Sequence, residues 1–387
     1  MSNCYSSNRS LPLLNEFSPR DRAVAEKALS NRESRLRGAS ASRGQKLEAY
    51  VDRLRGTFRD LVGAKKFAAL QEGLRRERLA FNELGQPPQG LNRDYAKQKS
   101  ASKRRADALF RKLGPSREKL ARLDKDARKG LEDLVPDAGG KVVPGFHLPG
   151  NLDKWTKLSP LHRFPLPWGF PPFEPDPNDP NRWFLFQPPF FGFLFSDDMI
   201  ATSNFRTDWL LHLHPPSGLV GLEATMDCDD AGSFDAAHVI AESQIAVAFV
   251  PPVAGVIEVL VDAQSTIGTH HTEIEDEWGF SNAWCRQKNY LMMNVLHPNV
   301  PQSSLALMSN MDVDTGGDDV TRNAENLTRG QHYFAQLFSA GPVPAGQSVI
   351  VTVGTRTFDI SRANDMELHS RTNFQWFINS VEVRISP

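Results

Sequence analysis

Residues 245–261 read IAVAFVPPVAGVIEVLV, and this stretch decides the fold class. Large apolar residues stand at every second position from 245 to 249, and the alternation returns from 257 to 261. An apolar period of two predicts two β-strands, and Pro251, Pro252 and Gly255 predict the turn between them. Because prolines interrupt the run and Glu258 lies within it, the stretch lacks the composition of a membrane-spanning helix.

The same alternation extends through the C-terminal half of the chain. Apolar residues alternate again in two later segments, 349–353 and 376–385. In the second segment the parity changes after Ile378, which predicts a β-bulge near Asn379. Many short strands without helical periodicity predict an antiparallel, jelly-roll-like β-sandwich domain over residues 196–387.

Residues 1–135 have a different, helical pattern. Ser18 followed by Pro19 and Asp21 predicts a helix start, because serine caps the first amides, proline fits the first turn and an acid suits the positive helix end. We expect this first helix to end at Gly38.

Three more helices are expected in this basic region. Apolar residues that alternate at spacings of four and three predict the second helix, which has a coiled-coil-like apolar seam. The third helix is predicted at residues 92–113, and the fourth begins after Pro115. Because narrow apolar stripes make only a small core, we expect the four amphipathic helices to form a thin bundle, or to dock on the β domain, a partner or another copy. The seam consists of Leu47, Val51, Leu54, Phe58 and Leu61.

A connector at residues 136–195 separates the two halves. Thirteen of the 27 prolines lie between Pro136 and Pro189, which excludes long helices. The connector is rich in aromatic residues, unlike a disordered linker. We expect an arm that packs along its own β domain; the alternatives are an arm around a neighbouring subunit and contact with a membrane interface. The expected contact residues are Trp183, Phe184, Phe186, Phe190, Phe191 and Phe193.

The charge of the chain is divided unevenly. Residues 1–140 contain 31 Lys and Arg against 18 Asp and Glu, a net charge of +13, whereas residues 141–387 contain 14 against 28, a net charge of −14. This asymmetry predicts either a solvated basic face or contact with nucleic acid, an anionic membrane or the acidic half of another copy. No helix-turn-helix or zinc-finger pattern surrounds the candidate anion-binding cluster. That cluster is Lys97, Lys99, Lys103, Arg104 and Arg105.

Two histidines are candidates for a metal site. His212 and His214 are two residues apart in a predicted strand, so both rings point to one face. His271, Glu273 and Glu275 share this spacing in another segment, and together such residues suit zinc or iron. The alternative is a pair of ordinary, half-exposed histidines.

An acidic, glycine-rich loop at residues 312–319 is a candidate calcium site, because calcium prefers several carboxylate oxygens on a flexible turn. The loop departs from the EF-hand pattern at Gly316 and Asn323, so a solvated acidic turn is the alternative. A second acidic loop lies at residues 227–235. The candidate ligands of the first loop are Asp312, Asp314, Asp318 and Asp319.

Catalytic signatures are absent from the sequence. It contains no GxSxG, HExxH, phosphate-binding loop or dinucleotide fingerprint. Its 3 cysteines are widely separated, which fits a reducing compartment better than a disulfide framework or a zinc site. No secretory signal is recognisable, so we expect a cytoplasmic protein or one exported without a classical signal peptide.

These patterns predict a non-enzymatic structural, assembly or recognition protein with a β-sandwich head and a basic helical tail. The alternatives are a calcium-assisted carbohydrate- or ligand-binding module, an effector or toxin without a signal peptide, and a metal-dependent enzyme that uses the strand histidines. No cofactor is expected, and calcium is the alternative. A protein partner or self-association is expected ahead of nucleic acid, and membrane contact is not expected.

Overall fold

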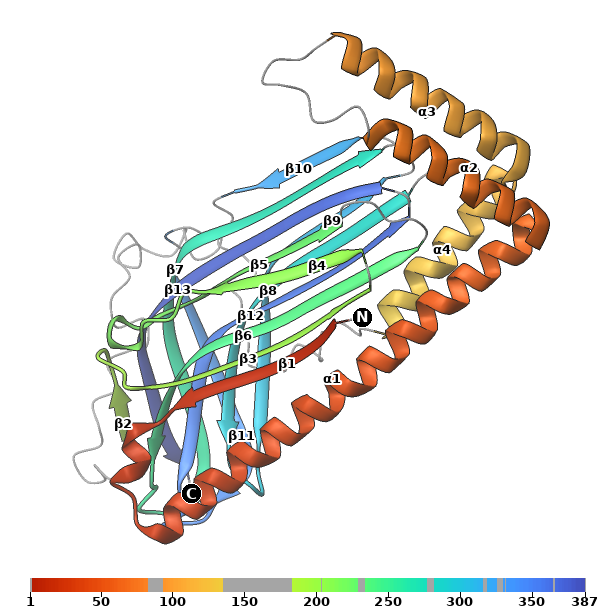
Figure 1. Ribbon diagram of the computed structural model, residues 1–387. Helices are drawn as coiled ribbons and strands as arrows, with labels where there is room; N and C mark the ends of the chain where they lie inside the picture. The colour runs from red at the N-terminus through yellow and green to blue at the C-terminus, as the bar shows by residue number, and fades with distance from the viewer. Residues whose placement is uncertain are drawn as a thin grey trace.

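The computed structural model contains two β-sheets and a helical layer (Figure 1). It describes residues 2–82, 93–134, 183–202, 204–228, 234–276, 282–315, 319–325, 330, 332–364 and 366–386. In chain order the elements are β1 (Ser2–Ser10), η1 (Pro12–Asn15), α1 (Pro19–Val62), α2 (Ala64–Asn82), α3 (Arg93–Leu113), α4 (Arg117–Leu134), β2 (Trp183–Phe186), β3 (Gly192–Ala201), β4 (Phe205–Leu211), η4 (Pro215–Ser217), β5 (Leu219–Cys228), β6 (Asp235–Phe249), β7 (Gly255–Asp276), β8 (Asn282–Leu296), β9 (Gln302–Thr315), β10 (Val320–Ala324), β11 (His332–Val343), β12 (Val349–Asn364) and β13 (Met366–Ser386).

The described strands form two antiparallel sheets. The six-stranded sheet, here sheet A, has the order β1-β3-β6-β12-β8-β9. The seven-stranded sheet, here sheet B, has the order β10-β7-β13-β5-β4, with β11 also paired to β7 and β2 to β13. Residues of both sheets share one buried apolar cluster, as in a β-sandwich. The predicted antiparallel β fold with a helical N-terminal region is therefore confirmed, while jelly-roll connectivity stays a prediction.

The stretch IAVAFVPPVAGVIEVLV connects the two sheets. β6 ends at Phe249 in sheet A and β7 begins at Gly255 in sheet B, so the two predicted strands are confirmed. The turn between them carries the chain from one sheet to the other, and Ile245 and Ile257 consequently face the same core. A glycine is required at the start of β7, because a Cβ there would lie 2.2 Å from the carbonyl oxygen of Ser386.

Sheet A begins with a strand that the sequence pattern does not predict. β1 pairs with β3 along its whole length, although its sequence, SNCYSSNRS, is polar and has no apolar alternation. Backbone hydrogen bonds need no apolar side chains, so such an edge strand leaves no hydrophobic signal. At the other end of the chain, the predicted bulge near Asn379 is confirmed by a register shift between Ile378 and Ser380.

One long helix, α1, contains both the first predicted helix and the Leu47–Leu61 seam of the second. The Oγ atom of Ser18 accepts a hydrogen bond from the backbone amide of Asp21 at 3.2 Å, so the predicted start of α1 is confirmed. The end predicted at Gly38 is wrong, since α1 continues to Val62. A glycine within a helix costs only about 1 kcal/mol, and α1 buries apolar side chains on both sides of Gly38. Gly63, with φ of 86°, ends the helix instead.

α1 and α4 lie along the outer face of sheet A (Figure 1). Leu29 of α1 packs in a cluster with residues of sheet A, and Phe58, near the other end of α1, packs 5.5 Å from the ring of Phe234. α4 lies back along α1, where the hydroxyl of Tyr50 donates to the carbonyl of Ala127 at 2.5 Å. α2 and α3 form a hairpin at one end of the molecule. No described helix is both long enough and apolar enough to cross a membrane.

Candidate functional site

Ion pairs join the helical layer to sheet A. Arg128 of α4 lies 3.0 Å from Asp312 and 2.7 Å from Asp314. Part of the basic surplus expected to meet a partner is therefore paired with acids of the same chain. Desolvation offsets most of the attraction in a buried pair, so these contacts are not by themselves a large source of stability. Three arginines of α1 each bind an acid of sheet A: Arg32 with Glu242, Arg43 with Asp198, and Arg55 with Asp235.

A serine, a histidine and an aspartate meet beneath α1. The Asp198 carboxylate accepts hydrogen bonds from Ser40 Oγ at 2.6 Å and Arg43 Nε at 2.7 Å, and lies 3.4 Å from His238 Nε2. Burial raises the pKa of Asp198, but His238, Ser40 and Arg43 outweigh it and lower the pKa to about 2. The serine binds the carboxylate instead of the imidazole, and all three side chains are buried, so this is not a catalytic triad.

The outer face of sheet B is a surface that no described α-helix covers (Figure 1). We call this surface, formed by the outward side chains of β4, β5, β13, β7 and β10, the open face. At its centre Glu223 accepts hydrogen bonds from Arg371 Nη2 at 2.8 Å and Asn373 Nδ2 at 2.9 Å. Gln375 Nε2 donates to Asn373 Oδ1 at 3.2 Å, which extends the row along β13. The open face therefore presents planar polar groups held in fixed positions.

An unpartnered nitrogen lies beside Glu223. His212 Nε2 is buried and has no hydrogen-bond partner, and it lies 4.0 Å from Glu223 Oε2. A larger residue at position 221 would crowd the neighbouring strand, because a Cβ there would lie 2.7 Å from Gln375 Cγ. Buried polar atoms normally have partners, so this arrangement leaves one hydrogen-bonding position unused. Next to it, Leu219 of β5 pairs with Phe377 of β13 and adds apolar surface.

The structure separates the two halves of the predicted metal site. His212 follows β4 and His271 lies on β7, and β5 and β13 run between them. Three strand spacings amount to about 14 Å, which is too far for one ion. His214 Nδ1 instead lies 3.0 Å from Ser217 Oγ, and His271 Nδ1 contacts Asn323 Oδ1. Within the described ranges no three His, Cys, Asp or Glu side chains are grouped to hold a metal ion.

Asp312, a predicted calcium ligand, is surrounded by donors. It accepts hydrogen bonds from Arg286 Nη2 at 2.6 Å, from Arg128 Nη2 at 3.0 Å and from Trp284 Nε1 at 2.7 Å. Both guanidinium groups also lie over the indole ring of Trp284, at 5.0 and 5.1 Å. These arginines are distant from Asp312 in the chain, so local sequence spacing does not reveal them. Their positive charge opposes a bound cation.

The remaining acids of the two predicted loops are placed as follows. Asp319 lies just before β10, whereas Asp318 of the first loop and Asp229 and Asp230 of the second are outside the described residues. In the second loop, Asp227 lies 3.0 Å from His369 Nδ1, and Asp235 accepts a hydrogen bond from Thr202 Oγ1 at 2.6 Å. Calcium binding at either loop stays a prediction.

Two ionisable groups are buried between the sheets. His270 lies 2.9 Å from Ser309 Oγ and 3.3 Å from Thr372 Oγ1, and burial lowers its pKa to about 4. Burial raises the pKa of Asp359 well above the ordinary carboxyl value. His270 is therefore neutral near pH 7, and burial favours the protonated, neutral form of Asp359. Because the two sheets enclose them, they have no route to a substrate.

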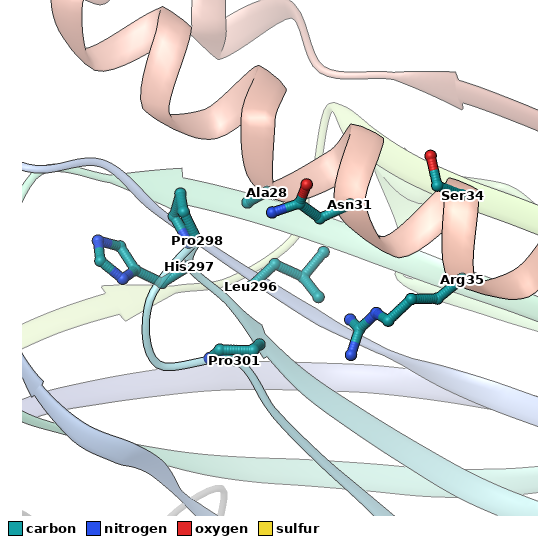
Figure 2. Close-up of a pocket in the computed structure, with 8 residues that line it drawn as sticks. All are labelled: Ala28, Asn31, Ser34, Arg35, Leu296, His297, Pro298 and Pro301. Carbon is teal, nitrogen blue, oxygen red and sulfur yellow. The ribbon is translucent and has the colours of Figure 1, made fainter.

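A cleft of ≈ 390 Å³ lies between α1 and the turn that joins β8 to β9 (Figure 2). Ala28 and Leu296 give it an apolar floor, and Arg35 lies at its rim. His297 is not available for catalysis there, because its Nε2 lies 3.0 Å from Gln347 Oε1 and its Nδ1 accepts a hydrogen bond from a backbone amide. Burial lowers the pKa of His297, which favours the neutral imidazole. We therefore place the candidate site at the open face.

The predicted anion-binding cluster lies on α3. Lys97 and Arg104 are exposed, and Arg105 pairs with Glu77 of α2 at 2.8 Å. The side chains of the other two members, Lys99 and Lys103, are outside the described residues.

The described part of the aromatic arm packs on the sandwich of its own chain. Trp183, Phe184 and Phe186 lie in β2, and the last two rings have centroids 4.9 and 6.2 Å from that of Phe249. Further along, Phe190 is buried and Phe193 lies in β3, whereas Phe191 is 58% exposed. Residues 135–182 are outside the described residues.

Comparisons with known proteins assign no family. No family model matches the chain, and no curated protein matches it. A GH26-CBM35 β-(1,4)-mannanase of Podospora anserina is 11% identical over 54% of this chain and 28% of that chain, with a TM-score of 0.13. Tailspike protein 4 of bacteriophage CBA120 is 9% identical over 47% of this chain and 18% of its own, with a TM-score of 0.11. A CBM4 structure is 11% identical over 50% of this chain and 90% of its own, also with a TM-score of 0.11.

The chain thus spans less than a third of the mannanase and of the tailspike domain. At TM-scores this low, the three likenesses establish neither a family nor a function.

Proposed function

We propose that this chain is a non-enzymatic recognition protein that binds a polar ligand at the open face of sheet B. One observation carries the proposal: the outer face of sheet A is covered by helices, whereas the opposite face presents Glu223 among fixed planar donors and acceptors, with His212 Nε2 unpartnered beside it. The helical half then acts as a brace for the sandwich. We also propose that the sandwich has jelly-roll connectivity.

A hydroxyl-rich ligand such as a carbohydrate fits this chemistry best. A sugar hydroxyl both donates and accepts, so it can bind a carboxylate and an amide or guanidinium together. Glu223, Asn373 and Arg371 offer these groups side by side. Phe377 and Leu219 supply the apolar surface against which the carbon face of a ring can pack.

Binding to a panel of soluble glycans tests the proposal. We expect Glu223→Gln to weaken binding at least tenfold, since a charge-assisted hydrogen bond contributes about 1.5–3 kcal/mol. The matched control is Glu258→Gln, because Glu258 lies in the same sheet and its side chain is exposed to the same extent, 14%. Repeating the titration with a chelator distinguishes calcium-assisted binding from direct binding.

Two results would overturn the proposal. One is the absence of glycan binding to the intact chain across the panel. The other is an equal loss of binding in both variants, which would place the ligand away from Glu223.

Assembly is the second candidate function, and exposed apolar side chains favour it. Leu185 of β2 is 44% exposed and Phe338 of β11 is 45% exposed. These strands lie on either side of the pair β13 and β7. Light scattering at low and high salt separates the two functions: a defined oligomer supports assembly, and a monomer at both salt concentrations removes it.

A further inference from the structure

The positive charge of the chain is concentrated on the α2–α3 hairpin. The two helices contain 13 Lys and Arg against 4 Asp and Glu, a net charge of +9. The whole chain has a charge of −1, so the remainder has −10. The hairpin is thus a basic projection on an acidic body.

The hairpin differs from the rest of the basic region in the acids with which its arginines pair. Arginines of α1 and α4 are paired with acids of sheet A, as described above. The ion pairs described for the hairpin are internal, Arg76 with Glu72 and Arg105 with Glu77, each at 2.8 Å. Further exposed cations are Arg104, Arg111 and Lys112. Among the side chains that the structure describes, the ion pairs given above for the hairpin therefore do not involve acids of the sandwich.

The hairpin also has a defined structure. At Gly73 the two helices approach so closely that a Cβ would lie 2.3 Å from Leu109 Cδ2. Ser102 Oγ donates to Glu77 at 3.3 Å, across the helix pair. The large apolar side chains described on both helices belong to the same cluster, which is continuous with α1 and sheet A. The hairpin has consequently no described apolar face of the kind with which an interfacial helix enters a membrane.

We infer that the α2–α3 hairpin binds the phosphate backbone of a nucleic acid without reading its sequence. Exposed Lys and Arg side chains replace the counterions condensed on a polyphosphate, and the released counterions drive binding. The basic side chains between Lys97 and Lys112 span about 22 Å along α3, the length of six or seven base pairs. The acidic remainder is repelled by the same backbone, so the complex forms at the hairpin.

The test uses the intact chain and a short labelled DNA duplex of mixed sequence. Fluorescence anisotropy should show binding that is independent of sequence and weakens about a thousandfold between 50 and 200 mM salt, as for about six phosphate contacts. The variant Arg104→Gln/Arg111→Gln/Lys112→Gln should lower the slope of log K against log salt by about three. The matched control is Lys27→Gln/Lys46→Gln/Arg53→Gln, which removes three exposed cations from α1 and should leave the slope nearly unchanged.

Several outcomes would overturn the inference. These are no binding at 50 mM salt, the same loss of slope in both triple variants, tighter binding to phosphatidylserine vesicles than to DNA, or salt-sensitive self-association without DNA binding. Circular dichroism of both variants excludes unfolding as the cause of a lost interaction. The glycan experiment is independent, because its variants lie on sheet B.

Discussion

The charge of a buried residue in this molecule is set by the strands around it. His270 lies between the sheets, and burial lowers its pKa to about 4, compared with 6.5 for the unperturbed group. As the pH falls from 6.5 toward 4, the unfolded chain takes up a proton at this residue and the folded chain does not. The contribution of His270 to stability is therefore complete above pH 6.5 and is lost through this window.

We expect the free energy of unfolding to fall by roughly 3 kcal/mol through His270 across that window. His270→Gln keeps groups that can hydrogen-bond to Ser309 and Thr372, and it should remove most of this dependence on pH. Urea unfolding at several pH values, with the exposed His214→Gln as the control, measures the difference. Identical pH profiles for wild type and His270→Gln would show that His270 is not held neutral.

Residue neighbours in space explain what the sequence could and could not predict about the site. The sequence singled out His212, but not Glu223 beside it, because strand pairing alone brings them together. The acids next to Asp312 in the chain predict a calcium ligand at this position. In the fold its nearest groups are Arg286 and Arg128, which come from other elements.

At the scale of elements, packing against a neighbouring element outweighs a local signal for the end of a helix, such as a glycine. The alternation in residues 245–261 predicted two strands correctly, since each needs only one apolar face. It could not predict that β6 and β7 belong to different sheets. Gly38 has the position of a helix end in the sequence, yet α1 continues through it because sheet A supports the helix on both sides.

This continuity predicts that Gly38→Ala stabilises the protein. Nothing lies within 4 Å of a Cβ at Gly38, so alanine should raise the free energy of unfolding by about 0.5–1 kcal/mol. Gly63→Ala is the control: it has equal space, but its φ of +86° disfavours any side chain, so we expect a loss of about 1 kcal/mol. Urea unfolding of both variants checks the signs. Destabilisation by Gly38→Ala would place a helix end there.

At the scale of the whole molecule, the structure shows where the charged side chains of the two halves lie. Part of the basic surplus pairs with sheet A, and most of the rest lies on the α2–α3 hairpin. On the open face of sheet B, Glu223 is paired with Arg371. The sequence showed the asymmetry and the two halves. It did not decide whether the helices dock on their own sheet, on a partner or on another copy, because narrow apolar stripes fit each of these arrangements and a thin bundle as well.

The central claim is that α1 and α4 form one structural unit with sheet A of the same chain. Hydrogen–deuterium exchange of the intact chain, at two protein concentrations, tests it most directly. We expect backbone amides of α1 to exchange as slowly as those of β6 and β12, independently of concentration, and those of α2 and α3 to exchange sooner. Exchange of α1 within seconds while β6 and β12 stay protected would contradict the claim, because it would show an undocked helix.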